Sequence, residues 1–211
     1  MKKNLSIAFT SALFICALAA IACEEKKDPV ETMMTGFMTG HTDSEGYITV
    51  LNDDFGRQYM VKEKSDKLVP DTLYRIVASV ALDENYSAKF VQMAQTLSYI
   101  APEDSIVPDT MRVKDPIQIV SAYIGGGYLN VYVDIKVKKE GTEHTFFYTH
   151  LNTPGKPAFT FYHNAYGDEP VYTKHAYVSI PLYGYGLARN DTVSLSCKSY
   201  EGDYDMNLIY K

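Results

Sequence analysis

Alternating apolar and polar residues in the second half of the chain predict an antiparallel sheet. One face of the segment 128–137 is aliphatic throughout: Leu129, Val131, Val133, Ile135 and Val137. The other face carries polar and aromatic residues: Tyr128, Asn130, Tyr132, Asp134 and Lys136. This pattern is typical of a strand with one covered face and one wet face. The glycines at 125–127 indicate a hairpin turn that pairs this strand with residues 117–124.

Five further segments of the same half are rich in β-branched and aromatic residues and are separated by turn residues. They are 145–151, 158–163, 175–182, 192–199 and 204–210. Together with the hairpin they make seven short strands, which is typical of a β-sandwich. We therefore predict a sandwich over residues 117–211.

The first half also predicts strands. Residues 47–51 and 57–61 flank the turn Asn52-Asp53-Asp54-Phe55-Gly56 and indicate a hairpin, and 73–82 reads as a longer strand. Residues 88–100 fit a strand, although an apolar stripe at helical spacing is also present, and we predict a strand. The segment 102–116 holds three prolines and six charged residues and cannot form a central strand. The sequence thus predicts an all-β chain with an N-terminal unit at 34–101, a linker at 102–116 and the sandwich.

The N-terminus carries an export signal. Lys2 and Lys3 precede an uncharged run of 16 residues, 7–22, which is shorter than the ~18–20 residues of a membrane-spanning helix. The run ends in Ala20-Ile21-Ala22-Cys23, which resembles the lipobox of bacterial lipoproteins. We predict a signal peptide at 1–22, lipidation of Cys23 and a polar tether at 23–33. An ordinary secretory cleavage site beside a chance cysteine is the alternative.

Charge and cysteine content limit the partners. A formal net charge of −6 makes nucleic acid an unsuitable partner. Cys16 would leave with the signal and Cys23 would carry lipid, so Cys197 would remain without an intramolecular disulfide. Cys197 alternates with Val193 and Leu195, which predicts a buried, inert thiol.

These features together resemble one family. The lipobox cysteine, the small N-terminal β-unit and the stretch Ile124-Gly-Gly-Gly-Tyr-Leu-Asn-Val131 resemble the NigD-like lipoproteins of Bacteroidetes. The resemblance implies an N-terminal OB-like barrel followed by a C-terminal β-sandwich. It implies no catalytic residues and no ligand, and the family's name comes from a bacteriocin-associated gene, which hints at competition between bacteria.

The sequence lacks the common catalytic and metal-binding motifs. The chain has no Gly-x-Ser-x-Gly elbow, no His-Glu-x-x-His, no Cys-x-x-Cys and no phosphate-binding loop. Asp203-x-Asp205-x-Asn207 begins like a calcium loop, but Leu208 stands where glycine is needed. His144 and His150 lie ~20 Å apart along an extended strand, too far to share a metal. We predict no enzyme activity, no cofactor and no metal.

Tyrosine is unusually abundant in the second half of the chain. Thirteen of the 18 tyrosines lie in residues 116–211, and Tyr128 and Tyr132 flank Asn130 on one strand face. We take these three residues as the candidate binding site for a glycan or a protein. High β-propensity explains tyrosines without any ligand, which is the alternative.

The leading interpretation is a non-enzymatic binding or interaction module. It would be anchored to the outer membrane through Cys23, on the periplasmic side or at the cell surface. A structural subunit of an outer-membrane assembly is the second interpretation. A carbohydrate-processing enzyme is the third.

Overall fold

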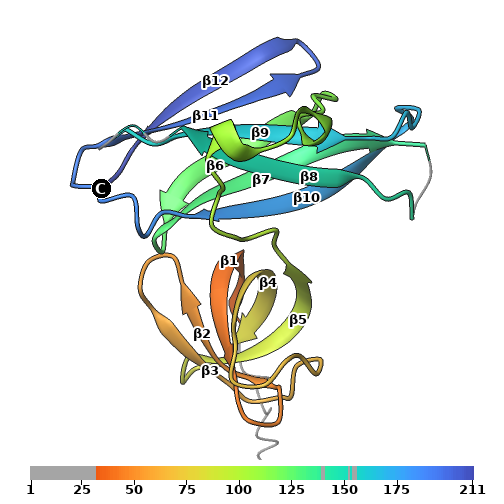
Figure 1. Ribbon diagram of the computed structural model, residues 1–211. Coiled ribbons are helices and arrows are strands. Elements are labelled where there is room, and N and C mark those ends of the chain that lie inside the picture. Colours follow the sequence, from red (N-terminus) through yellow and green to blue (C-terminus); the bar gives the residue numbers. More distant parts are fainter. Residues whose placement is uncertain (1–31, 139–140, 152, 154–155) are drawn as a thin grey trace, which may run out of the picture.

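The chain folds into a barrel followed by a sandwich, which confirms the all-β prediction (Figure 1). The computed structural model describes residues 32–138, 141–151, 153 and 156–211. Five strands close the barrel in the order β1-β2-β3-β5-β4. They are β1 (Thr32–Thr42), β2 (Ile48–Asp53), β3 (Gln58–Val61), β4 (Leu73–Leu82) and β5 (Ser87–Gln95).

Barrel closure depends on a parallel pair. β1 pairs antiparallel with both β2 and β4, and β3 completes the circle by pairing parallel with β5 at Met60 and Ser87. A closed five-stranded barrel has no free edges, and side chains fill its interior. The interior residues are Met38, Ile48, Leu51, Tyr59, Ile76, Ala78, Val80, Leu82 and Ala88.

Two sheets form the sandwich. The three-stranded sheet has the order β10-β7-β6, and the four-stranded sheet has the order β12-β11-β9-β8. The strands are β6 (Gln118–Gly125), β7 (Tyr128–Val137), β8 (Thr145–Leu151), β9 (Ala158–Asn164), β10 (Tyr172–Pro181), β11 (Thr192–Ser199) and β12 (Gly202–Ile209). The aliphatic face of β7 is fully buried between the sheets, as its alternation predicts.

The ambiguous segment 88–100 is a strand, which ends at Gln95. Beyond it, Leu97 forms a parallel bridge with Val178 of β10. The chain therefore passes from barrel to sandwich within a few residues.

The predicted linker 102–116 lies against the sandwich. It contains two short 3-10 turns, η1 (Asp104–Ile106) and η2 (Asp109–Met111). Two of its backbone carbonyls accept hydrogen bonds from the sandwich. Pro102 O accepts one from His150 N, and Val113 O accepts one from His163 N. Asp104 accepts hydrogen bonds from Thr149 at 2.8 Å and Tyr162 at 3.0 Å. These contacts hold the segment on β8 and β9, and the division into folding units stays a prediction.

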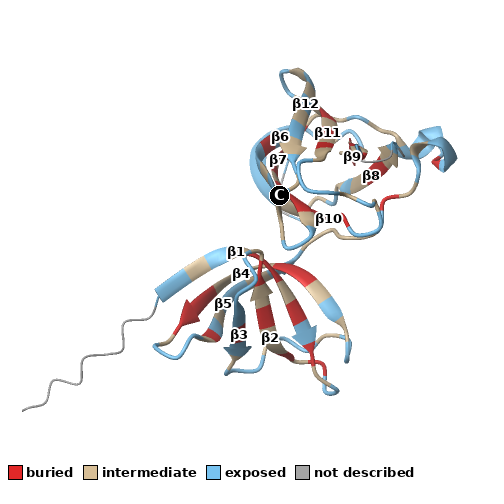
Figure 2. Cartoon of the chain, turned by 90° about the vertical axis from the view of Figure 1, so that its left-hand side faces the viewer, coloured by how far each residue is buried: buried red, intermediate tan, exposed pale blue. Residues whose placement is uncertain are grey.

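The start of the barrel differs from the prediction by two residues. Thr32 and Met33 pair with Leu82 and Ala81, so they belong to β1 and not to the tether. The rest of the tether, Cys23 and the signal peptide lie outside the described residues. Figures 1 and 2 both place the three-stranded sheet, with β10, on the side of the sandwich that faces the barrel.

Candidate functional site at the waist

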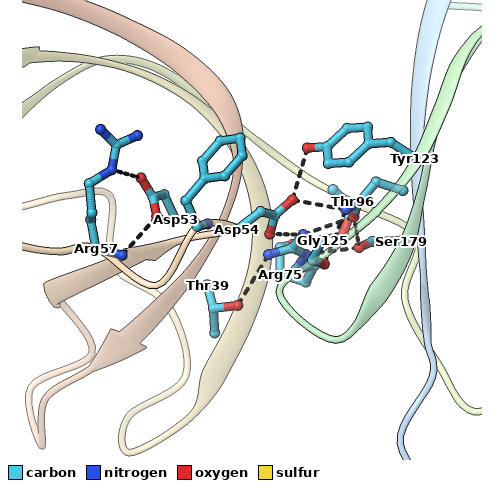
Figure 3. A network of polar contacts seen from close by, with 11 residues as sticks. Thr39, Asp53, Asp54, Arg57, Arg75, Thr96, Tyr123, Gly125 and Ser179 are labelled. Atoms are coloured by element: carbon cyan, nitrogen blue, oxygen red, sulfur yellow. Dashed lines mark hydrogen bonds and ion pairs between the residues drawn. The ribbon is translucent and has the colours of Figure 1, made fainter. Parts of the chain in front are cut away.

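A buried charge pair of the barrel makes hydrogen bonds to the sandwich (Figure 3). Arg75 of β4 and Asp54, in the turn after β2, approach to 2.5 Å between Nη2 and Oδ1, and each side chain is only 3% exposed. The same guanidinium donates to Asn130 Oδ1 at 2.8 Å and to Ser179 Oγ at 2.8 Å, both in the sandwich. A buried charge is costly unless it is paired and hydrogen-bonded, so this network fixes how the two units dock.

The second oxygen of Asp54 also bonds to the sandwich. Asp54 Oδ2 accepts from Tyr123 Oη at 2.8 Å and from Asn130 Nδ2 at 2.8 Å. Burial, followed by the hydrogen bond to this carboxylate, raises the pKa of Tyr123 above its usual value. Asp54 is therefore saturated with partners from both units.

The glycine turn permits this close approach. Gly126 N donates to Asp54 O at 3.2 Å, and its φ of +60° lies in the left-handed region. A Cβ added at Gly126 would lie 2.5 Å from Asp54 Oδ1, which no ordinary contact allows. The run 125–127 thus forms the predicted hairpin and also admits the barrel loop.

Asn130 requires a correction. The alternation places it on the polar face of β7, where its amide was expected to face solvent and a ligand. In the structure it is 0% exposed, because the barrel covers this part of the face. Its amide donates to Asp54 and accepts from Arg75 and from Ser179 Oγ at 2.6 Å. Asn130 is a docking residue with no side-chain surface for a ligand.

Tyr128 and Tyr132 lie on opposite sides of this docking point along β7. Tyr128 lies against the Arg75 guanidinium, 4.3 Å from the ring centroid. Tyr132 stacks on Tyr177 at 5.1 Å, with His175 against its edge. Both tyrosines are half-buried and neither is in the core between the sheets. The structure therefore does not bring the three predicted site residues into one surface, and ligand binding by either tyrosine stays a prediction.

A hollow on the Tyr128 side, here called the waist pocket, has a volume of about 320 Å³. Both units line it, and Arg75 is among the lining residues. The aromatic and hydroxyl side chains around it are Thr39, Tyr74, Ser98, Tyr99, Tyr128 and Tyr183. Because barrel and sandwich residues both contribute, the pocket exists only in the docked molecule.

A second and wider hollow, here called the waist groove, lies on the Tyr132 side, with a volume of about 750 Å³. Gln92 of β5 faces residues of β10 across it, among them Tyr172, His175 and Tyr177. The rings of Tyr132 and Tyr177 stack face to face, so each covers one face of the other. The ring of Phe37 packs against Tyr177 in a T-shaped arrangement, with an interplanar angle of 83°. The groove also contains the exposed ring of Tyr172 and the imidazole of His175, whose Nδ1 lies 2.6 Å from Asp134 Oδ1.

Two of the five histidines, His144 and His163, form a buried pair elsewhere in the sandwich. His144 Nδ1 lies 2.9 Å from His163 Nε2, and His144 Nε2 lies 3.1 Å from Asp168 Oδ2. The His144 side chain is 1% exposed, and burial, followed by the charge of His144, lowers the pKa of His163. The two rings are tilted by 41°, with their centroids 4.9 Å apart. Among the described residues, no group of three or more His, Cys, Asp or Glu is placed to hold a metal ion.

Cys197 is a buried thiol, as predicted. It is 7% exposed, and burial raises its pKa to about 11, which favours the protonated thiol at neutral pH. In the part of the chain that the structure describes, no helix is long and apolar enough to cross a membrane.

The barrel-plus-sandwich architecture defines a class of two-unit, all-β proteins, and comparison with known proteins places the chain within it. The family model described as the NigD-like C-terminal beta sandwich domain matches residues 101–210, which is over half of the chain. The chain belongs to the NigD-like family.

Solved structures share this fold. A NigD-like immunity protein from Bacteroides caccae is 24% identical, with a TM-score of 0.68 over 83% of this chain and 92% of that one. A protein from Parabacteroides distasonis, provisionally described as toxin-related, is 21% identical, with a TM-score of 0.65 over 85% and 94% of the two chains.

A Bacteroides fragilis protein, provisionally described as a lipoprotein, is 14% identical, with a TM-score of 0.59 over 85% and 99% of the two chains. At these identities the likeness shows the fold. Among curated proteins no match is found.

Proposed function

We propose that the protein is a non-enzymatic binding module of the bacterial outer membrane and that its waist is the binding site. One observation carries this proposal: two hollows flank the docking point, and each takes side chains from both the barrel and the sandwich. Binding sites occur preferentially at such junctions between domains. The buried Arg75–Asp54 pair holds the walls of both hollows in place.

Anchoring through Cys23 supports the location. The lipobox-like Ala20-Ile21-Ala22-Cys23 and the short apolar run before it favour lipidation, and one structural neighbour is described as a lipoprotein. Cys23→Ala should release the protein from membranes, because lipid chains supply the anchoring energy. Fractionation of cells tests this: a cleaved mutant still firmly bound to membranes would exclude lipid anchoring at Cys23.

The relatives' descriptions suggest which ligands to screen. Two neighbours are described as an immunity protein and as toxin-related, so secreted proteins of competing bacteria form one arm of the screen. Neutral saccharides form the other arm, because tyrosines line the waist. Thermal shift of the whole lipidated protein in detergent provides the readout, since a ligand that binds only the folded state raises its apparent stability.

Matched variants locate the binding. Tyr183 in the waist pocket is 64% exposed and Tyr172 in the waist groove is 62% exposed, so alanine at either position removes a similar exposed ring. Ile106→Ala, at a 72% exposed position on η1 outside both hollows, is the control. A ligand whose affinity falls tenfold or more with one tyrosine variant, and not with the control, supports the proposal. Binding unchanged by both tyrosine variants would reject the waist as the site.

The same screen separates the other interpretations. A structural subunit would co-purify in a stable complex that both tyrosine variants leave intact. An enzyme would return a chemically altered ligand.

A further inference from the structure

The waist pocket is lined by hydroxyl groups that the protein itself does not use. The hydroxyls of Ser98, Tyr128 and Tyr183 have no hydrogen-bond partner among the described residues. Thr39 Oγ1 acts only as an acceptor, from Arg75 Nη1 at 3.3 Å, and keeps a proton to donate. Four hydroxyls from both units can therefore bond a polar molecule in one small space.

Two aromatic rings in the same pocket have unoccupied faces. Tyr183 is 64% exposed and makes no ring contact with any described residue. Tyr128 is held from one side by the Arg75 guanidinium, and no other described ring packs on it. A ring fixed in this way loses little entropy when a ligand packs against it.

The charge in the pocket is already neutralised. Arg75 is the only charged residue among those that line it, and its side chain is 3% exposed and paired with Asp54. An anionic ligand would have to compete with this buried carboxylate, and a cationic ligand would meet a cation. The pocket therefore fits an uncharged molecule.

We infer that the waist pocket binds a neutral saccharide, with one sugar ring packed against Tyr128 and Tyr183 and its hydroxyls bonded to Ser98 and Thr39. A pyranose ring combines an apolar C–H face with a rim of hydroxyls, which is the combination that the pocket complements. A volume of about 320 Å³ is at the small end of ligand sites, which suits one ring or the end of a chain. This inference rests on the proposed function and assigns the ligand class of one of its two hollows.

The test uses the whole lipidated protein in detergent, labelled at tyrosine ring carbons for NMR. The probes are glucose, galactose, mannose, N-acetylglucosamine, maltose and lactose, each titrated into the millimolar range. At least one sugar should shift the Tyr128 and Tyr183 signals and leave those of Tyr172 and Tyr177 in place. Tyr183→Ala should lower the affinity for that sugar tenfold or more, whereas Tyr172→Ala, at a similarly exposed residue, should leave the affinity unchanged.

Two milder variants keep the test conclusive if an alanine variant fails to fold. Tyr128→Phe keeps the ring on Arg75 and removes only the hydroxyl, and Ser98→Ala removes one unpartnered hydroxyl. Each variant should lower the affinity for the sugar severalfold, while the midpoint of urea unfolding stays at the wild-type value.

The outcomes distinguish this inference from the proposed function. If no sugar shifts the pocket signals, or if sugars act only at Tyr172 and Tyr177, the saccharide assignment is wrong. If a secreted protein binds instead of a sugar and Tyr183→Ala lowers its affinity, the saccharide assignment fails and the proposed function stands. If neither arm gives a ligand sensitive to Tyr183→Ala or Tyr172→Ala, both fail.

Discussion

Tyr99 and Tyr148 stack face to face, and each hydroxyl is bonded to the backbone of the other residue. Their ring centroids lie 4.1 Å apart at an angle of 7°. Tyr148 Oη accepts from Tyr99 N at 2.8 Å and donates to Tyr99 O at 2.6 Å, and Tyr99 Oη accepts from Tyr148 N at 2.9 Å. Burial raises the pKa of Tyr99 to about 12 and also raises that of Tyr148. The pair fastens the chain that leaves the barrel onto β8.

Removing one hydroxyl of this pair should cost substantial stability. Tyr148→Phe leaves the N–H and C=O of Tyr99 without their partner, and orphaned buried groups cost about 1–3 kcal/mol each, so we expect a loss of about 2–3 kcal/mol. Urea denaturation measures it. Tyr166→Phe, which removes an exposed hydrogen bond to Thr145, should cost little. Equal losses in the two variants would mean that the reciprocal bonds add no stability.

Breaking the waist charge pair should loosen the docking. Asp54→Ala leaves the Arg75 guanidinium buried without its carboxylate, which costs about 3–5 kcal/mol for a buried pair. Small-angle scattering should show a larger radius of gyration, and the urea midpoint should fall. Glu45→Ala removes the partner of Lys64 in an exposed pair and should cost less than about 1 kcal/mol. An unchanged radius and midpoint for Asp54→Ala would contradict the docking role.

Alanine variants of two neighbouring glycines distinguish the cost of backbone strain from the cost of disturbed docking. Gly126 and Gly127 both have positive φ, so alanine strains the backbone at both, by about 1 kcal/mol. Only at Gly126 does the new Cβ also meet Asp54, because nothing lies within 4 Å at Gly127. Gly126→Ala should therefore be clearly less stable than Gly127→Ala and should expand the molecule. Identical melting and scattering would show that the close approach to Asp54 is not required.

The buried histidine pair should make stability fall in acid. Burial lowers the pKa of His163, so folding favours its neutral ring. This contribution is complete above the unfolded value of about 6.5 and is lost as the pH falls through the lower folded value. Urea midpoints at neutral pH and near pH 5 measure the loss. His163→Gln should reduce the fall, and His175→Gln, at an exposed residue, should not. An equal fall in wild type and His163→Gln would assign the acid sensitivity to other groups.

Cys197 should react slowly with thiol reagents in the folded protein. Its burial and its raised pKa both suppress the thiolate that would attack the reagent. Unfolding in urea should restore rapid labelling. Labelling of the folded chain at the unfolded rate would mean that β11 has its faces exchanged.

Local patterns in the sequence were sufficient to predict the fold class and most strands. The alternation in β7 identified all five of its core residues, and β4 and β8 have the predicted bounds. This works because a strand with one buried face repeats every two residues. Barrel closure could not be predicted in this way, because β3 and β5 pair in parallel between residues far apart in the sequence.

The docking site was missed for a related reason. Asp54 sits in a turn, where turn chemistry alone accounts for an aspartate. Arg75 gave the available signal, since it is the only charged residue in the otherwise apolar strand β4. A buried cation needs a carboxylate, but the sequence does not say which one. The His144–His163 contact was equally hidden, because it joins the residue before β8 to β9 across 19 residues.

The segment that connects the two units also protects the sandwich from its neighbours. Leu97 exchanges backbone hydrogen bonds with Tyr177 and Ser179 on β10, and Pro102 accepts one from His150 on β8. Each of these strands is at the edge of its sheet, and uncovered edges recruit strands from other chains. Covering these edges reduces the chance that other copies of the chain add to the two sheets and aggregate.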